Sequence, residues 1–193
     1  MQFVATSEFE STVPADVAAL TRDFEAVVRL YRPKVFRFAL ASLRDLDAAE
    51  TVTQDCFLRA YQARDRFRRD CSMHTWLMQI AVNLIRDHQR SRRMQFWRRA
   101  GRTATPADVA AHAVADRQAS PETLALLRER VAAIWSAAQR LPEKQRMVFL
   151  LRFVEDLDLL EIAAATGMKE GTVKTHLFRA VRAVRERLAG GST

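Results

Sequence analysis

The stretch from Asp158 to Leu188, DLLEIAAATGMKEGTVKTHLFRAVRAVRERL, decides how this chain folds. It opens with Asp158 and places Glu161 three residues later, the pattern of a helix N-terminus in which the Glu side chain bonds the cap's own N–H. The apolar run that follows stops at Gly167, which suits the left-handed residue that ends a helix. A second helix is predicted from about Lys169 to Leu188. Two short helices joined by a Gly-containing turn predict a helix-turn-helix.

The second predicted helix has one apolar face and one polar face. The apolar residues recur at spacings of three and four and are Val173, Leu177, Val181, Val184 and Leu188. The opposite face carries Gly171, Thr175, Phe178, Arg182 and Arg185, flanked by Lys174 and Arg179. A helix that enters the major groove of DNA needs such basic and polar residues in its first turns. Phe178 is the exception on this face, and it either packs against the preceding helices or contacts a thymine methyl group.

The charge of the chain points to a polyanionic partner. The net charge is +8 over 193 residues, and the isoelectric point is about 10.4. The charge is also clustered, because residues 86–102 hold seven Arg and one Asp, whereas residues 1–16 hold three acids and no Lys or Arg. Clustered basic charge is the electrostatic footprint of a nucleic-acid-binding protein.

Several classes of protein are disfavoured by composition. An apolar run of 18 residues and a signal peptide are both absent, so we expect a cytoplasmic protein that does not insert into a membrane. Cys56 and Cys71 lack CxxC spacing and are expected to be reduced thiols. With four scattered histidines they supply too few ligands for a zinc site, so we expect no metal or other cofactor.

The fold class expected for the whole chain is all-α. Gly and Pro number five each, and the apolar residues follow helical spacing. Pro33 either kinks the first helix or starts a new one. Asp45 or Asp47 is the candidate cap of the second helix, and Cys71 or Ser72 that of the third. Ahead of the helix-turn-helix, helices are predicted over residues 16–43, 48–66, about 72–93, 121–139 and 143–153.

Two of these helices have faces that bear on function. The helix over 48–66 is expected to bury Val52, Phe57, Leu58 and Tyr61, together with Ala60. The next helix is expected to bury Trp76, Leu77, Ile80, Ala81, Leu84 and Ile85, and to expose Gln79, Asn83, Arg86, Arg90 and Arg93. Asn is a poor residue within a helix, so Asn83 is either hydrogen-bonded inside the fold or retained for a ligand.

Several stretches of sequence carry a resemblance to a known family. Leu141–Arg146 (LPEKQR), Glu161–Ala163 and Gly171–Leu177 (GTVKTHL) resemble region 4 of the extracytoplasmic-function (ECF) sigma factors. Residues 49–61 resemble the segment of region 2 that holds the polymerase clamp helices. Residues 67–70 with 75–83 resemble the segment that opens and reads the −10 element. The motif TVKTHL also resembles response-regulator DNA-binding domains, but those follow an α/β receiver domain, and nothing in this chain alternates strand with helix.

The resemblance implies two small helical domains joined by a flexible linker. Residues 1–15 would be a disordered extension, 16–93 region 2, 94–120 the linker and 121–193 region 4. The linker begins with basic residues, which either follow a path near the active-site and RNA-exit channels of polymerase or form a solvated tether. Residues 107–115 are a candidate short helix. The implied partners are core RNA polymerase, through its β′ clamp helices and β flap, promoter DNA and an anti-sigma factor.

The resemblance also implies three sets of site residues. Those expected to bind core polymerase are Glu50, Gln54, Asp55 and Phe57. Those expected at the −10 element are Phe67, Arg68, Arg69, Asp70, Trp76, Asn83, Arg86 and Arg90, and those at the −35 element are Gly171, Thr172, Lys174, Thr175, Phe178 and Arg179. Thr51 and Asp55 depart from the family pattern in the first set and are expected to soften the affinity for core. Arg69 and Met73 depart from it in the −10 segment and leave the preferred base open.

The function implied is that of an initiation subunit and not of an enzyme. It would recognise the −10 and −35 elements and help to melt the promoter. A helix-turn-helix regulator that acts without replacing the sigma subunit is the alternative, and it would bind promoter DNA tightly without polymerase. A nuclease would need clustered carboxylates for metal, whereas the acids here lie as helix caps and surface pairs.

Overall fold

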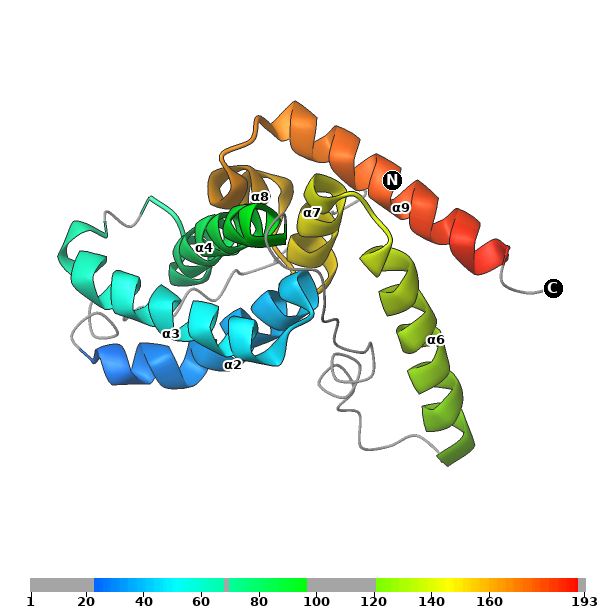
Figure 1. Cartoon of the computed structure of the whole chain (residues 1–193), viewed down its shortest axis with the longest axis horizontal. Coiled ribbons are helices and arrows are strands. Elements are labelled where there is room, and N and C mark those ends of the chain that lie inside the picture. Colours follow the sequence, from blue (N-terminus) through cyan, green and yellow to red (C-terminus); the bar gives the residue numbers. More distant parts are fainter. Residues whose placement is uncertain (1–22, 68–69, 97–120, 191–193) are drawn as a thin grey trace, which may run out of the picture.

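The computed structural model describes residues 23–67, 70–96 and 121–190. All regular structure in these ranges is helical, which confirms the expected fold class (Figure 1). The predictions for residues 1–15, for most of the linker and for a short helix at 107–115 lie outside the described residues.

The first group of helices comprises α2 (Phe24–Leu43), α3 (Leu46–Ala63) and α4 (Met73–Phe96), with a short 3-10 helix, η1 (Arg64–Arg66), after α3. Pro33 lies inside α2 and does not start a new helix. Asp45 caps α3 by accepting from the Ala48 N–H at 3.0 Å. The Ser72 hydroxyl accepts from the Thr75 N–H at 3.0 Å and so caps the first turn of α4.

The second group comprises α6 (Pro121–Gln139), α7 (Glu143–Phe153), α8 (Leu159–Thr166) and α9 (Glu170–Ala189). Asp158 accepts from the Glu161 N–H at 2.8 Å, and Glu161 accepts from the Asp158 N–H at 3.0 Å. This pair is the predicted capping arrangement of α8. Gly167 ends α8 with φ of 68°, as its position required. The predicted helix-turn-helix is therefore present as α8 and α9.

The buried face of α3 differs from the prediction. Leu58 and Tyr61 are 55% and 48% exposed, so the expectation that they are buried was wrong. Leu58 lies about 100° around the helix from its neighbour Phe57, because an α-helix has 3.6 residues per turn. The residues that α3 does bury are Ala48, Ala49, Val52, Thr53, Cys56, Phe57 and Ala60.

The two groups of helices pack against each other and share one apolar core. The helix α8 lies against α4, and α7 lies against α2 (Figure 1). The shared cluster includes Leu77 and Met78 from α4 together with Leu151 from α7 and Ile162 from α8, all fully buried. The helix-turn-helix is therefore held against the N-terminal helices in this structure.

Candidate functional site

The helix α9 presents its polar face to solvent. Its apolar face is anchored by Val173 and Val184, which are 0% and 5% exposed. Phe178, by contrast, is 69% exposed, so packing against the preceding helices is excluded for this ring. All six residues predicted for the −35 element are exposed to solvent. They are Gly171, Thr172, Lys174, Thr175, Phe178 and Arg179.

The surroundings of this face are electropositive. The His176 Nδ1 atom is buried without a hydrogen-bond partner. Burial lowers the pKa of His176, and the nearby cations Lys144 and Arg179 lower it further. A histidine whose protonation is opposed by two cations marks a surface of positive potential, which favours an anion such as a DNA phosphate. Lys174 pairs with Glu170 at 2.6 Å, so a phosphate would compete with that carboxylate for the Lys174 ammonium.

The residues predicted for the −10 element are not all equally accessible. Asp70, Asn83 and Arg90 are exposed. Because Asn83 faces solvent, the alternative that it is hydrogen-bonded inside the fold is wrong, and a ligand role remains a prediction. Phe67 and Trp76 pack on each other with ring centroids 4.9 Å apart. Arg68 and Arg69 lie outside the described residues.

Arg86, another of the predicted −10 residues, is engaged within the protein. It donates from Nη1 to the Thr166 carbonyl oxygen at 2.9 Å. This carbonyl belongs to the last turn of α8, where carbonyl groups lack helical partners and a cation is favourable. The Arg86 guanidinium is therefore bound to the helix-turn-helix in this structure.

The residues predicted to bind core polymerase lie on α3. Gln54 and Asp55 are exposed, and Glu50 is half-buried and paired with Arg32. Phe57 is only 7% exposed and belongs to the apolar core, so the prediction that it contacts polymerase directly is corrected: it holds α3 in place.

Sequence reasoning missed Leu58 as a surface residue. It follows Gln54 by one helical turn and is 55% exposed, so it adds an apolar side chain to the exposed surface around Gln54. Val52, Cys56 and Ala60 recur at intervals of four residues, and Leu58 falls outside this series. That pattern would have identified Leu58 as a surface residue.

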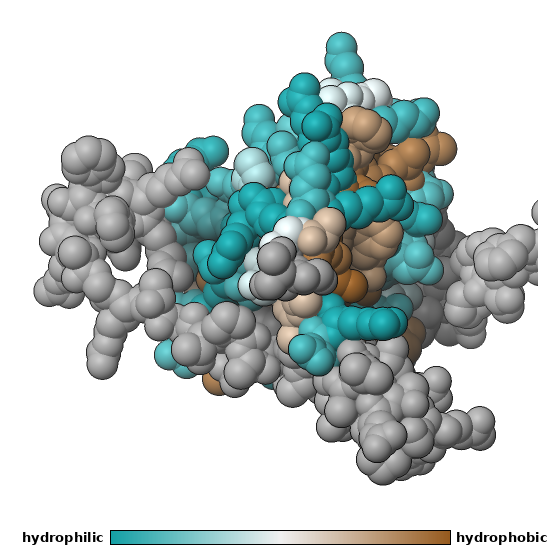
Figure 2. Space-filling model, turned by 90° about the vertical axis from the view of Figure 1, so that its right-hand side faces the viewer, coloured by the Kyte–Doolittle hydropathy of each residue, from teal (hydrophilic) through white to brown (hydrophobic). Residues whose placement is uncertain are grey.

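An apolar groove of about 510 Å³ lies between α6, α7 and α9. Figure 2, which views this end of the molecule, shows the apolar surface framed by hydrophilic side chains. Arg37 and Arg185 are the charged residues in its lining. Its apolar lining includes Ile134, Trp135, Phe149, Phe153, Val184 and Leu188.

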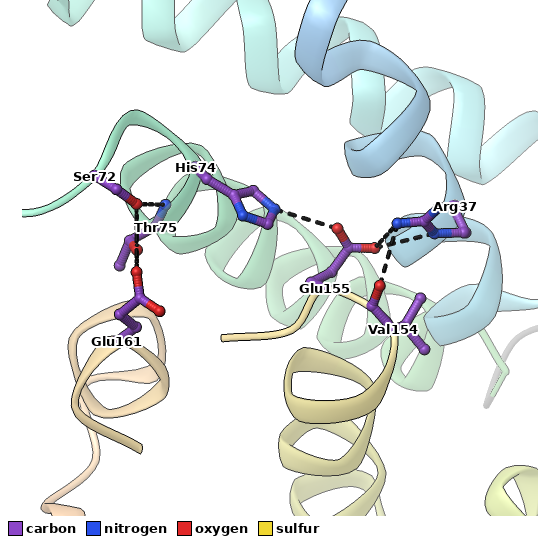
Figure 3. A network of polar contacts seen from close by, with 7 residues as sticks. All are labelled: Arg37, Ser72, His74, Thr75, Val154, Glu155 and Glu161. Carbon is purple, nitrogen blue, oxygen red and sulfur yellow. Dashed lines mark hydrogen bonds and ion pairs between the residues drawn. The ribbon is translucent and has the colours of Figure 1, made fainter. Parts of the chain in front are cut away.

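A cluster of polar contacts joins the two groups of helices (Figure 3). The Glu155 side chain is fully buried and accepts from Arg37 Nη2 at 3.1 Å. It also lies 3.2 Å from His74 Nε2. Thr75 donates to Glu161 at 2.8 Å, and Ser72 donates to the same oxygen at 3.4 Å. We call these six residues, Arg37, Ser72, His74, Thr75, Glu155 and Glu161, the interdomain polar cluster.

The described residues offer neither a membrane-spanning helix nor a cluster of metal ligands. No helix in the described ranges is long and apolar enough to cross a membrane. Among the same residues, no group of three or more His, Cys, Asp or Glu side chains could hold a metal ion.

Comparison with protein families gives two matches in the order of the chain. The profile described as Sigma-70 region 2 matches residues 27–95, and the one described as Sigma-70, region 4 matches residues 132–184. The first match spans α2 to α4, and the second begins in α6 and ends in α9.

Curated relatives match over most of their length. The RNA polymerase sigma-H factor of Pseudomonas aeruginosa is 33% identical over 172 residues, which cover 84% of each chain. The ECF RNA polymerase sigma-E factor of Escherichia coli K12 is 31% identical over 83% of this chain and 84% of that protein. The ECF RNA polymerase sigma factor SigW of Bacillus subtilis is 29% identical over 86% of this chain and 88% of that protein.

Solved structures share the fold. The sigma factor RpoE in complex with the anti-sigma factor NepR from Bartonella quintana gives a TM-score of 0.68 at 22% identity, covering 87% of this chain and 98% of that one. CnrH in complex with the cytosolic domain of CnrY gives a TM-score of 0.58 at 21% identity, covering 91% of this chain and 96% of that one.

Proposed function

The chain belongs to the extracytoplasmic-function sigma factors of RNA polymerase, and we propose that it assigns promoter binding and polymerase binding to separate helix faces. The observation that carries this proposal is the exposure of two sets of side chains. One set lies on α3, around Gln54 and Asp55, and the other on the outer face of α9, around Lys174 and Phe178. Each set lies within a different one of the two matched regions.

The α3 surface is proposed to bind the β′ clamp helices of core polymerase. Gln54 and Asp55 supply exposed polar groups, and Leu58 adds apolar area beside them. Small interfaces of this kind depend on a few residues that lose water completely. Replacing Gln54 and Asp55 together by Ala should abolish co-purification with core polymerase.

The matched control for this pair is Gln62→Ala with Asp65→Ala, an exposed amide and an exposed acid further along the same surface. This control should co-purify normally. Both double variants should keep native helicity by circular dichroism. Normal co-purification of the Gln54 and Asp55 variant would remove α3 from the polymerase interface.

The segment from Phe67 to Arg90 is proposed to capture an unstacked base of the −10 element. Unstacking costs a few kcal/mol, which contacts to the extruded base repay, so that melting and reading occur together. Exposed Asn83 is the proposed base contact, and Arg90 is a proposed phosphate contact. Asn83→Ala should therefore impair transcription from duplex promoters more than from templates already melted at −10.

The control for Asn83 is Gln62→Ala, which removes another exposed helical amide in the same domain. It should leave transcription from both templates unchanged. Equal losses on duplex and pre-melted templates for Asn83→Ala would contradict the proposed role in melting.

The outer face of α9 is proposed to read the −35 duplex in the major groove. Lys174 and Thr175 lie in the first turns of the helix, where a recognition helix contacts bases. Two weak sites on one chain strengthen each other through effective concentration. For that reason, the free protein should bind promoter DNA poorly, and the holoenzyme should bind it well.

The apolar groove between α6 and α9 is proposed to receive the β flap of polymerase. It lies on the side of α9 that bears Val184 and Leu188, away from Lys174 and Phe178, so flap and DNA could be bound at once. Ile134 is 38% exposed in the groove lining. Replacing Ile134 by Asp should weaken promoters that depend on −35 contacts while leaving co-purification with core intact.

The regulation proposed for the chain is by an anti-sigma factor in the cytoplasm. Relatives of the same fold were solved with anti-sigma factors, as in RpoE with NepR. No catalytic step is proposed for the chain itself. Its contribution is to position core polymerase at a promoter.

The deciding experiment is run-off transcription with purified core polymerase on a promoter library. Transcripts should depend on the chain and should return shared −10 and −35 sequences. A helix-turn-helix regulator would instead bind promoter DNA tightly on its own and would support transcription only when another sigma factor is present. That second outcome would overturn the proposal.

A further inference from the structure

The apolar groove between α6, α7 and α9 leaves large side chains open to solvent. Phe153 is 57% exposed, and Ile134 and Leu188 are 38% and 36% exposed. Its volume of about 510 Å³ lies within the range of pockets that hold a small ligand, about 300–1,000 Å³, and is enough for a few side chains of a short segment. Apolar side chains that gather on a surface in this way mark a binding site for another apolar group.

The charge in the lining of the groove is positive. Arg37 and Arg185 are its charged residues, and Arg37 is already paired with Glu155. Arg185 is exposed, and its guanidinium forms no ion pair or hydrogen bond with any residue that the structure describes. Its neighbour Arg182, by contrast, pairs with Glu186 at 2.7 Å. The groove therefore favours an occupant that combines an apolar side chain with a carboxylate, because a carboxylate would pair with the Arg185 guanidinium.

The chain itself contains such a combination in residues 1–16. This segment has three acids and no Lys or Arg. Phe9 stands between Glu8 and Glu10, so one aromatic residue has a carboxylate on each side. Residues 97–120, the other long stretch outside the described ranges, hold four Arg and two Asp. Of these two stretches, residues 1–16 have the charge that complements Arg185.

The chain is long enough to bring Phe9 to the groove. Asp23 caps α2 by accepting from the Ala26 N–H at 3.1 Å, so this helix begins at Phe24. Arg37, in the groove lining, lies 14 residues beyond Asp23, or about 21 Å along the helix at 1.5 Å per residue. The 14 residues from Phe9 to Asp23 can span up to about 46 Å when extended. Because α2 packs against α7, which forms one wall of the groove, this length exceeds the distance to be covered (Figure 1).

We propose that this groove is an intrachain docking site for residues 1–16, in which the Phe9 ring enters the groove and Glu8 or Glu10 pairs with Arg185. A segment tethered to its own site is presented at an effective concentration on the order of millimolar, so a contact of only millimolar affinity would be occupied about half of the time. The same groove is proposed to receive the β flap, so the docked segment competes with the flap. This competition rests on the proposed function, whereas docking does not.

Docking is measured in the full-length protein without DNA or polymerase. A nitroxide spin label at Ser11→Cys, in a Cys71→Ser background, broadens the NMR signals of methyl groups that lie near it, and the remaining Cys56 is buried. The methyl signals of Ile134 and Leu188, in the groove lining, should lose most of their intensity. Full intensity of both signals would overturn the proposal.

Two changes in the labelled segment should differ in their effect. Phe9→Ala removes the proposed anchor and should restore most of the intensity of the two groove signals. The matched control is Phe3→Ala, because Phe3 is an aromatic residue of the same segment without flanking acids. This control should leave the intensity loss unchanged. Equal recovery in the two variants would overturn the assignment of Phe9 as the anchor.

The ion pair is tested by an exchange of charge. Glu8→Lys with Glu10→Lys should restore the groove signals, because two cations would then face Arg185, and adding Arg185→Glu should bring the intensity loss back. The matched control is Arg187→Glu, since Arg187 is exposed on the same helix but does not line the groove. It should not bring the loss back. Equal rescue by both changes would mean that only net charge matters and would overturn the pairing with Arg185.

Docking between two copies of the chain is distinguished by mixing. Spin-labelled protein without NMR isotopes is combined with isotope-labelled protein that carries no spin label. Intrachain docking gives no broadening in this mixture. Broadening of the groove signals in the mixture would mean that the segment of a second copy occupies the groove, and it would overturn the intrachain assignment.

Competition with the flap is measured by run-off transcription with holoenzyme on a promoter that depends on its −35 contacts. If the NMR signals show the segment docked nine-tenths of the time, Phe9→Ala should raise transcription by up to about tenfold, because apparent affinity scales with the competent fraction. Phe3→Ala should leave transcription unchanged. Phe9→Ala combined with Ile134→Asp should be as weak as Ile134→Asp alone, since the flap then lacks its groove.

The outcomes separate the two proposals. Docking by NMR without a rise in transcription for Phe9→Ala would overturn the competition with the flap and leave the docking site in place. If docking were observed but no holoenzyme initiated transcription, the docking site would stand and the proposed function would fail.

Discussion

Phe178 projects an aromatic ring into solvent from the polar face of α9, beside Lys174 and Thr175. An exposed ring gains nothing from the core of its own domain. Apolar contact with a thymine methyl group is one of the few uses for such a ring in a major groove. The exposure of this ring excludes packing against the preceding helices, and contact with a thymine methyl group stays a prediction.

Arg179 and Arg185 offer a matched pair on the same helix. Both are exposed arginines, but Arg185 lines the apolar groove, whereas Arg179 belongs to the predicted −35 set. Arg179→Ala should cost about 1–3 kcal/mol of −35 binding and flatten the preference at one position, as expected for loss of a base contact. Arg185→Ala should leave sequence preference unchanged. Selection of −35 sequences by both holoenzymes is the measurement, and the reverse pattern would mean that α9 docks the other way along its axis.

The two cysteines should differ in reactivity. Burial raises the pKa of the Cys56 thiol to about 12, and its Sγ lies 3.5 Å from the Leu77 carbonyl oxygen. Burial also raises the pKa of Cys71, and the carboxylates of Asp70 and Glu161 raise it further. Because the thiolate is the reactive form, Cys71 should react slowly at pH 7 and faster as the pH rises, and Cys56 only after unfolding. The rates at which the two thiols react with a chromogenic disulfide measure this difference, and Cys71→Ser is the control. Rapid labelling of two thiols in the native protein would contradict the prediction.

Among the elements, α8 has both of its ends fixed by local chemistry. Gly167 has φ of 68°, and a Cβ added there would meet nothing within 4 Å. Gly167→Ala should therefore lower the free energy of unfolding by about 1–2 kcal/mol through backbone strain alone, without a steric clash. Gly167→Asn should cost less, because Asn adopts this conformation more readily. Urea unfolding measures both, and equal losses would show that something other than backbone conformation is limiting.

The elements also show which features a sequence can predict. Asp158, Glu161 and Gly167 lie within about three helical turns of one another, so their pattern can be recognised in the sequence. The helix-turn-helix was therefore predicted together with its caps. Leu58 was misassigned because one step around a helix, about 100°, separates a buried from an exposed position. The groove and the interdomain polar cluster could not be predicted. Arg37 and Glu155 stand 118 positions apart, and no local pattern encodes such a pairing.

For the whole molecule, the shared core predicts how the protein unfolds. Leu77 and Met78 from the first group of helices pack in one cluster with Leu151 and Ile162 from the second. Unfolding of either group exposes apolar surface on the other, so calorimetry of the full-length protein should show one transition with equal calorimetric and van't Hoff enthalpies. Two transitions in the unchanged protein would mean that the shared core contributes little coupling.

Arg37 belongs to two features at once, because it binds Glu155 across the domain boundary and also lines the apolar groove. If the two groups of helices separate, this side chain leaves the groove wall, so the groove of the packed structure differs from that of the separated one. Binding of a ligand in the groove is then coupled to separation of the two groups of helices. Consider a ligand that binds the groove of the packed structure more tightly, by a given factor, than the groove of the separated one. When it saturates the groove, it lowers the ratio of separated to packed protein by that factor. A small antagonist of this protein would therefore not need to cover any surface that touches DNA; it would need only to fit better while Arg37 is in place.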